Sequence, residues 1–217
     1  MKRDEDYSPT NYIQRLISEG EHVNQDFKFE ISDARKIAKS LSAFANTSGG
    51  RLLVGVKDNG KIAGVRSEEE IYMIEAAAQM YCKPSLYTEN QIYKVEGRDL
   101  LIVQIPEASE KPVYALDENN TPWAYIRIKD ENILADIVHL NMWKHNHEEK
   151  NIVVTYTERE KHLLDIMGQN ELITINRCSN LSKIPRKEVG RLIADFIRFN
   201  LVEAIFIDHK FYYRLKE

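Results

Sequence analysis

The chain has 217 residues, of which 43% are hydrophobic and 29% are charged. These proportions are typical of a globular protein in water, and the length suits one large domain or two modest ones. The longest apolar runs are far too short to cross a bilayer, and no apolar region follows the charged N-terminus. We therefore expect neither a membrane span nor a secretory signal. Cys82 and Cys178 stand alone without metal-ligand spacing, which favours a reduced, cytoplasmic location.

Charge is unevenly distributed along the chain. The formal net charge is −4, which argues against non-specific nucleic-acid binding by the molecule as a whole. Residues 151–217 contain 11 Lys or Arg and 9 Asp or Glu, a balance of +2, whereas the preceding residues carry −6. This asymmetry is mild, and by itself it does not indicate a partner.

Local signals in the first two-thirds predict a mixture of helices and strands. Ser8 as N-cap and Pro9 at the first helical position begin a helix that Gly20 ends. A second helix is expected from about Asp33, and the segment Ser67–Glu70 reads as a capping box that opens a third. A further helix is expected over residues 132–143. The expected strands cover residues 23–31, 51–56, 62–65, 91–96, 99–105 and 123–128.

The C-terminal part has signals of its own. The polar segment 145–150 reads as a linker, and the capping box Thr157–Glu160 then begins a helix that ends at Gly168. A short helix is expected over 175–181, a longer one from Pro185 to Asn200, and a final hairpin from strands 204–207 and 211–214. Helices followed by a hairpin are the order of a winged helix-turn-helix. We therefore expect a first domain over residues 1–145, a linker over 146–156 and a second domain over 157–217.

Three segments follow one another within about forty residues: an acid-rich strand beginning Glu21-His-Val-Asn-Gln-Asp26-Phe-Lys28, a helix ending Asn46-Thr-Ser-Gly-Gly50, and the hairpin Leu53-Val-Gly-Val-Lys-Asp-Asn-Gly60. Their order and spacing resemble the Schlafen-type AlbA-like domain, often labelled a divergent ATP-binding domain in bacteria. The resemblance covers roughly residues 10–140. It implies an α+β fold with a small mixed sheet, followed here by the winged helix.

The resemblance also implies candidate catalytic residues. Schlafen-type ribonucleases use three carboxylates, and the matching positions are Glu21, Asp26 and Asp58, which would hold Mg²⁺ or Mn²⁺ during phosphodiester cleavage. Lys28 shares a strand face with Asp26 and would contact phosphate. Residues five apart on a regular strand point to opposite faces, so Glu21 must lie on the turn after Gly20 to join Asp26. The alternative is that these are solvated acids and a turn aspartate.

Other motifs favour structural interpretations. Residues 55–61 match the opening of a phosphate-binding loop, but Ile62 replaces the Ser or Thr that holds Mg²⁺ and a strand follows instead of a helix. We expect neither ATP nor another cofactor, apart from Mg or Mn in a nuclease. Gly49 and Gly50 permit a tight turn, while Thr47 and Ser48 offer hydroxyls for phosphate binding. The histidines at positions 139, 145 and 147 read as a polar helix end, not a metal site.

The expected recognition helix supplies the candidate DNA-binding residues. Its apolar positions are spaced for packing, and cations at other positions suit phosphate contacts and bidentate contacts to guanine. The wing adds two more cations, and Glu188 and Asp195 interrupt the basic face. The candidate nucleic-acid-binding residues of this domain are Arg186, Lys187, Arg191, Arg198, Lys210 and Arg214.

The segment from Leu181 to Val202 resembles the winged helices of bacterial transcriptional regulators. Together these observations predict a DNA-binding protein that acts as a transcriptional regulator. The winged helix would contact duplex DNA, and the AlbA-like domain would bind nucleic acid, a ligand or a partner. A homo-oligomer is expected because paired modules raise effective affinity and match two half-sites. A divalent-metal-dependent endoribonuclease acting on RNA through the three carboxylates is the first alternative. A protein-interaction module is the second.

Overall fold

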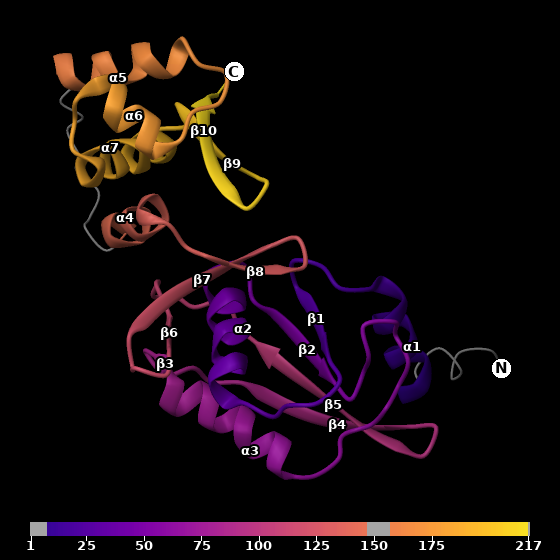
Figure 1. Cartoon of the computed structure of the whole chain (residues 1–217). Coiled ribbons are helices and arrows are strands. Elements are labelled where there is room, and N and C mark those ends of the chain that lie inside the picture. Colours follow the sequence, from indigo (N-terminus) through magenta and orange to yellow (C-terminus); the bar gives the residue numbers. More distant parts are fainter. Residues whose placement is uncertain (1–7, 147–156, 217) are drawn as a thin grey trace. The chain divides into compact units, whose positions relative to one another are not determined.

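The computed structural model describes residues 8–146 and 157–216 (Figure 1). The chain divides into two compact units, Met1–Leu134 and Ala135–Glu217. The boundary lies before helix α4 (Ile137–Asn146), so this helix belongs to the second unit, not to the first domain as the sequence predicted. The predicted linker lies outside the described residues, except for Asn146 at the end of α4. No described helix is both long and apolar enough to cross a membrane.

The first unit is α+β, as predicted. Its helices are α1 (Pro9–Glu19), α2 (Ala34–Asn46) and α3 (Glu69–Ala76), the last continued by a π-helical segment, Ala77–Tyr81. Its strands are β1 (Gln25–Lys28), β2 (Gly50–Val54), β3 (Cys82–Lys83), β4 (Glu89–Val95), β5 (Arg98–Ile105), β6 (Tyr114–Leu116), β7 (Pro122–Ile128) and β8 (Glu131–Leu134).

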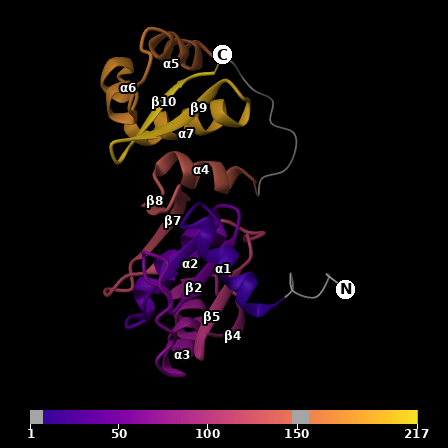
Figure 2. The ribbon, with the colours of Figure 1, turned by 90° about the vertical axis from the view of Figure 1, so that its right-hand side faces the viewer.

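A mixed four-stranded sheet lies at the centre of this unit. Its order is β1-β2-β5-β4, with β1 parallel to β2 and the other pairs antiparallel. Successive strand residues point to opposite faces, so Leu52 and Val54 join the core around α2 while Leu53 joins the core around α1. Burial on both faces explains the continuous apolar run in β2. Helix α2 also packs against the second sheet, β3-β6-β7-β8, and lies between the two (Figures 1 and 2).

Several local signals are confirmed at the residues that carry them. The Ser8 hydroxyl accepts a hydrogen bond from the Asn11 amide, 3.1 Å away, and caps α1. Asp33 caps α2 in the same way. Gly60 adopts a left-handed φ of 77° in the predicted turn, but only an isolated bridge, between Val56 and Ile62, forms beyond β2.

Other expectations were wrong. The capping box at Ser67 does not form, because the Glu70 carboxylate accepts from the amides of Arg66 and Ile31, at 2.7 and 2.9 Å. Strand β1 is shorter than residues 23–31, and residues 62–65 form no strand. The helix expected over 132–143 begins later, since its first residues pair with β7 as strand β8.

The second unit has the order expected of a winged helix. After α4 come α5 (Glu158–Gly168), α6 (Ile175–Ser182), α7 (Arg186–Arg198), β9 (Val202–Ile207) and β10 (Lys210–Leu215). The capping box at Thr157 is present, and Asn200 adopts the left-handed conformation after α7. Ile173 forms an isolated bridge with Tyr213, which adds a third chain segment beside the hairpin.

Helix α4 is fastened to the rest of this unit by apolar and polar contacts. A Cβ atom added to Gly190 of α7 would lie only 2.7 Å from Ile137 Cγ2, so the two helices touch closely at this glycine. Asp136 caps α4 and pairs with the Nδ1 atom of His139 at 2.8 Å, and it also accepts a hydrogen bond from the buried Tyr213 hydroxyl. Val138 belongs to the same hydrophobic core as α7. The helix is therefore an integral part of the winged-helix unit.

Candidate nucleic-acid interface and carboxylate pair

Two of the three predicted acids lie together. Glu21 lies on the turn after Gly20, before β1 begins, and its carboxylate accepts a hydrogen bond from the Phe27 amide at 2.8 Å. The Glu21 carboxyl also interacts with that of Asp26, which is buried in β1. Residues five apart on a regular strand would point to opposite faces, but Glu21 lies on the turn and not on the strand, so it can reach the side of Asp26.

The Glu21 carboxyl holds a proton more tightly than an ordinary glutamate does. Burial and the hydrogen bond to Asp26 raise the pKa of Glu21 to about 7, against an ordinary value of 4.5, although the Phe27 amide opposes the change. Two carboxyl groups in contact cannot both ionise easily, since their charges repel. The Glu21 carboxyl therefore exchanges its proton close to neutral pH.

Two cations balance the pair, and the sequence interpretation included only one of them. Lys28 Nζ lies 2.7 Å from Asp26 Oδ2, as its place on the same strand face predicted. The second cation is Arg127 of β7, whose side chain is 1% exposed and whose Nη1 lies 3.8 Å from the same oxygen. Arg127 stacks over the Phe44 ring at 4.7 Å, and burial lowers the pKa of its guanidinium. An arginine within an otherwise apolar strand was the signal that could have revealed it.

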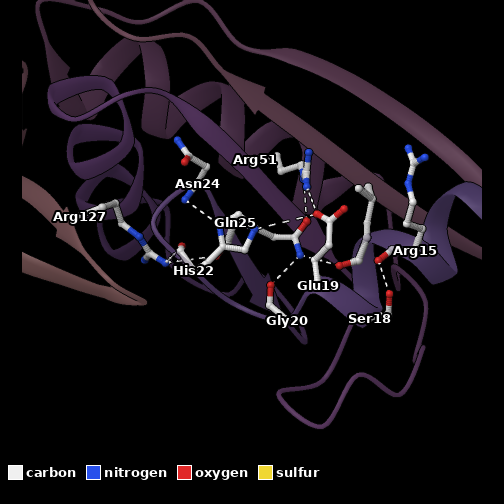
Figure 3. Close-up of polar contacts among 10 residues, drawn as sticks. Arg15, Ser18, Glu19, Gly20, His22, Asn24, Gln25, Arg51 and Arg127 are labelled. Atoms are coloured by element: carbon white, nitrogen blue, oxygen red, sulfur yellow. Dashed lines mark hydrogen bonds and ion pairs between the residues drawn. The ribbon is translucent and has the colours of Figure 1, made fainter.

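A polar network holds the turn that carries Glu21 (Figure 3). The buried Gln25 side chain donates to the carbonyls of Leu16 and Gly20, at 2.6 and 2.7 Å, and accepts from Arg51 Nε at 2.6 Å. Arg127 donates from Nη2 to the His22 carbonyl at 3.1 Å on the other side of the turn. These bonds link α1, β1, β2 and β7, so the position of Glu21 depends on strands far apart in the sequence.

The third predicted acid does not complete a metal site. Asp58 is exposed in the turn between Lys57 and Gly60, which is closed by a 2.8 Å backbone hydrogen bond. Across residues 8–146 and 157–216, no group of three or more His, Cys, Asp and Glu side chains is placed to hold a metal ion. The residues present therefore do not fit a three-carboxylate ion site. Of the three histidines considered, His139 pairs with Asp136, His147 lies outside the described residues, and the side chain of His145 is likewise not described.

The residues of the glycine-rich motif after α2, 47–50, make contacts that hold the fold together. Thr47 Oγ1 donates to the Ala43 carbonyl and accepts from the Arg127 amide, both at 2.8 Å. The Ser48 hydroxyl accepts from Asn24 at 2.7 Å. A Cβ atom at Gly49 would meet the Glu107 amide at 2.8 Å, and one at Gly50 would meet the Phe44 ring, so neither position has room for a side chain.

The cations of α7 divide into two groups. Arg186 and Lys187 are exposed at its start, next to exposed Lys183 in the turn after α6, and we call these three residues the cationic turn. Among the described residues, no acidic side chain forms an ion pair with any member of the cationic turn, although Arg186 Nε donates to Asn176 at 2.9 Å. This group points to an anionic partner.

The remaining predicted cations are mostly paired. Arg191 lies 2.7 Å from Glu188 and 3.1 Å from Asp195, and Arg198 lies 3.8 Å from Asp195. On the wing, Arg214 pairs with a neighbouring glutamate at 2.6 Å, whereas Lys210 is exposed. The predicted basic face, which Glu188 and Asp195 interrupt, is therefore a basic end followed by a stripe of alternating, compensated charge.

Comparisons with known proteins agree with this architecture. A family model described as Schlafen, AlbA_2 matches residues 21–136, and no curated protein matches the chain significantly. The DIP2311 protein from Corynebacterium diphtheriae is 16% identical with a TM-score of 0.50, over 86% of this chain and 41% of that chain. The N-terminal domain of a "Putative ATP-dependent DNA Helicase RecG-related Protein" from Nitrosomonas europaea is 22% identical with a TM-score of 0.44, over 70% of this chain and 97% of that domain.

The likeness to the Corynebacterium protein concerns the fold alone, and this chain covers less than half of that protein's length. The family model, in contrast, matches more than half of the chain, residues 21–136. The matched segment includes Glu21, Asp26, Lys28 and Arg127. The chain belongs to the Schlafen AlbA_2 family.

Proposed function

We propose that this protein binds duplex DNA through its winged-helix unit and acts as a transcriptional regulator. The observation that carries the proposal is the cationic turn at the start of α7, whose three cations have no acidic partner among the described residues. A recognition helix contacts DNA chiefly through its N-terminal residues, and the phosphate backbone supplies most of the affinity. Exposed Lys210 on the wing would add a backbone contact.

Salt dependence tests the proposal. Arg186→Gln/Lys187→Gln removes two cations, so the slope of log K against log salt should become shallower by about 1.8, from roughly 0.9 for each phosphate contact. Fluorescence anisotropy of a labelled duplex at several salt concentrations measures this slope. The matched control is Lys161→Gln/Lys94→Gln, which removes the same charge at exposed positions outside the cationic turn. Equal affinity and slope for the two double variants would contradict the proposal.

The AlbA-like unit would then bind nucleic acid, a ligand or a partner, and a homo-oligomer would match paired half-sites. Light scattering during size-exclusion chromatography tests the oligomer, with a monomeric mass as the contrary result. The metal-dependent endoribonuclease stays a prediction, and no ion site among the described residues supports it. It predicts metal-dependent cutting of stem-loop RNA that Asp58→Asn abolishes. Absence of both duplex binding and cutting would leave the protein-interaction module.

A further inference from the structure

A stripe of alternating charge runs along the solvent side of α7. Apolar and small residues fill the rest of the helix surface, including Val189, Leu192 and Phe196. Beyond the cationic turn, the residues that stay partly accessible are Glu188, Arg191, Asp195 and Ile197-Arg198. Arg191 is the most accessible of the charged members, with 43% of its side chain exposed. It is therefore the stripe's cation best placed to meet DNA.

Arg191 is held between two carboxylates of its own helix. Its Nη2 lies 2.7 Å from Glu188 Oε1, one turn toward the N-terminus, and its Nη1 lies 3.1 Å from Asp195 Oδ2, one turn toward the C-terminus. Each carboxylate has a second cation, since Arg159 lies 3.5 Å from Glu188 and Arg198 lies 3.8 Å from Asp195. Residues three and four apart share a helix face, so the helix itself sets this arrangement.

A DNA phosphate that approaches Arg191 meets the two carboxylates bonded to that guanidinium, each of which also has a second cation, Arg159 or Arg198. It must take guanidinium hydrogen atoms already bonded to carboxylates, and like charges close together repel. A base edge differs from a phosphate in this respect, because it offers donors as well as acceptors. Carboxylates accept hydrogen bonds from the cytosine amino group, and arginine donates to guanine.

We propose that Glu188 and Asp195 form an internal clamp that withholds Arg191 from the phosphate backbone and so restrains non-specific duplex binding. The clamp rests on the proposed DNA-binding function and determines its specificity. Non-specific affinity then comes from the cationic turn, while Arg191 engages only where the groove supplies partners for the two carboxylates. The acids that interrupt the basic face are thus part of how this helix discriminates among sequences.

The test removes the negative charges of Glu188 and Asp195 and keeps side chains of nearly the same shape. Glu188→Gln/Asp195→Asn should bind a labelled duplex of arbitrary sequence about ten-fold more tightly, as expected for one added charge-assisted contact of about 1.4 kcal/mol. The salt slope should steepen by about 0.9, the value for one further phosphate contact. Adding Arg191→Gln to this variant should return both quantities toward those of the wild type. Thermal unfolding of each variant verifies that the fold is kept.

The matched control is Asp165→Asn/Glu171→Gln, which removes two exposed carboxylates elsewhere in the same unit. An equal gain in this control, or a gain that Arg191→Gln leaves intact, would overturn the clamp while the proposed function stands. Duplex binding by Glu188→Gln/Asp195→Asn, with none by the wild type, would support the clamp. No binding by the wild type or any variant would overturn the proposed function and the clamp together.

Discussion

Replacing Asn46 by alanine tests whether the motif after α2 is a structural element. The Asn46 side chain is buried, and its Nδ2 donates to the carbonyls of Val113 and Tyr125 at 2.8 and 2.9 Å. Its Oδ1 accepts from the Val113 amide at 2.7 Å. The Val113 carbonyl retains the Ser42 hydroxyl at 2.8 Å, so the alanine variant leaves the buried Val113 amide and the partly buried Tyr125 carbonyl without these partners. At about 1–3 kcal/mol for each group, the free energy of unfolding should fall by roughly 2–6 kcal/mol.

Urea unfolding measures this loss if the signal comes from the first unit alone. The chain has two tryptophans, one in each unit, and a Trp143→Phe background leaves Trp123 of β7 as the reporter. Ser48→Ala is the control, because its exposed hydroxyl should contribute no more than about 0.5 kcal/mol. A loss below about 1 kcal/mol for Asn46→Ala, or one equal to that of the control, would refute the reasoning.

Three further predictions concern other parts of the chain. The pKa of Glu21 is raised from 4.5 to about 7, so the folded state binds more protons than the unfolded state between these pH values, and stability should fall as pH rises through this range. Glu21→Gln should therefore flatten the dependence of melting temperature on pH, and an unchanged profile would contradict this. Gly190→Leu should destabilise the second unit by about 1–3 kcal/mol in denaturant unfolding, because the added side chain overlaps Ile137, and wild-type stability would refute the close contact. Tyr213→Phe removes the hydroxyl bonded to Asp136 and should cost roughly 1.5–3 kcal/mol in the same assay, whereas no change would show that the bond contributes nothing.

Elements with short-range signals could be predicted from the sequence. The caps at Ser8, Asp33 and Thr157 lie within three residues of the groups they satisfy, so their geometry depends on the local chain alone. The left-handed conformation of Asn200 and the terminal hairpin likewise depend on residues that are close along the chain. Order and spacing of such signals were enough for the α+β fold and the winged-helix order of elements, whereas the family was indicated by the resemblance of the three motifs between Glu21 and Gly60.

Features that depend on distant residues could not be predicted in this way. Glu70 appeared to belong to a local capping box, but its carboxylate accepts from Ile31, 39 residues away. Strand β8 had the composition of a helix start, and pairing with β7 made it a strand. Sequence composition placed the domain boundary near residue 145, whereas packing against α7 assigns α4 to the second unit.

The candidate sites divide in the same way. The family resemblance of the sequence implied that Glu21 and Asp26 act together, and the period of a strand placed Lys28 on the same face as Asp26. Only the tertiary structure placed Arg127 beside Asp26, since that contact joins strands about a hundred residues apart. Along α7 the sequence supplied the charges, and the packing of the helix decided which remain open to solvent. A charged residue's role depends on its neighbours in space, and the sequence shows only those that are also close along the chain.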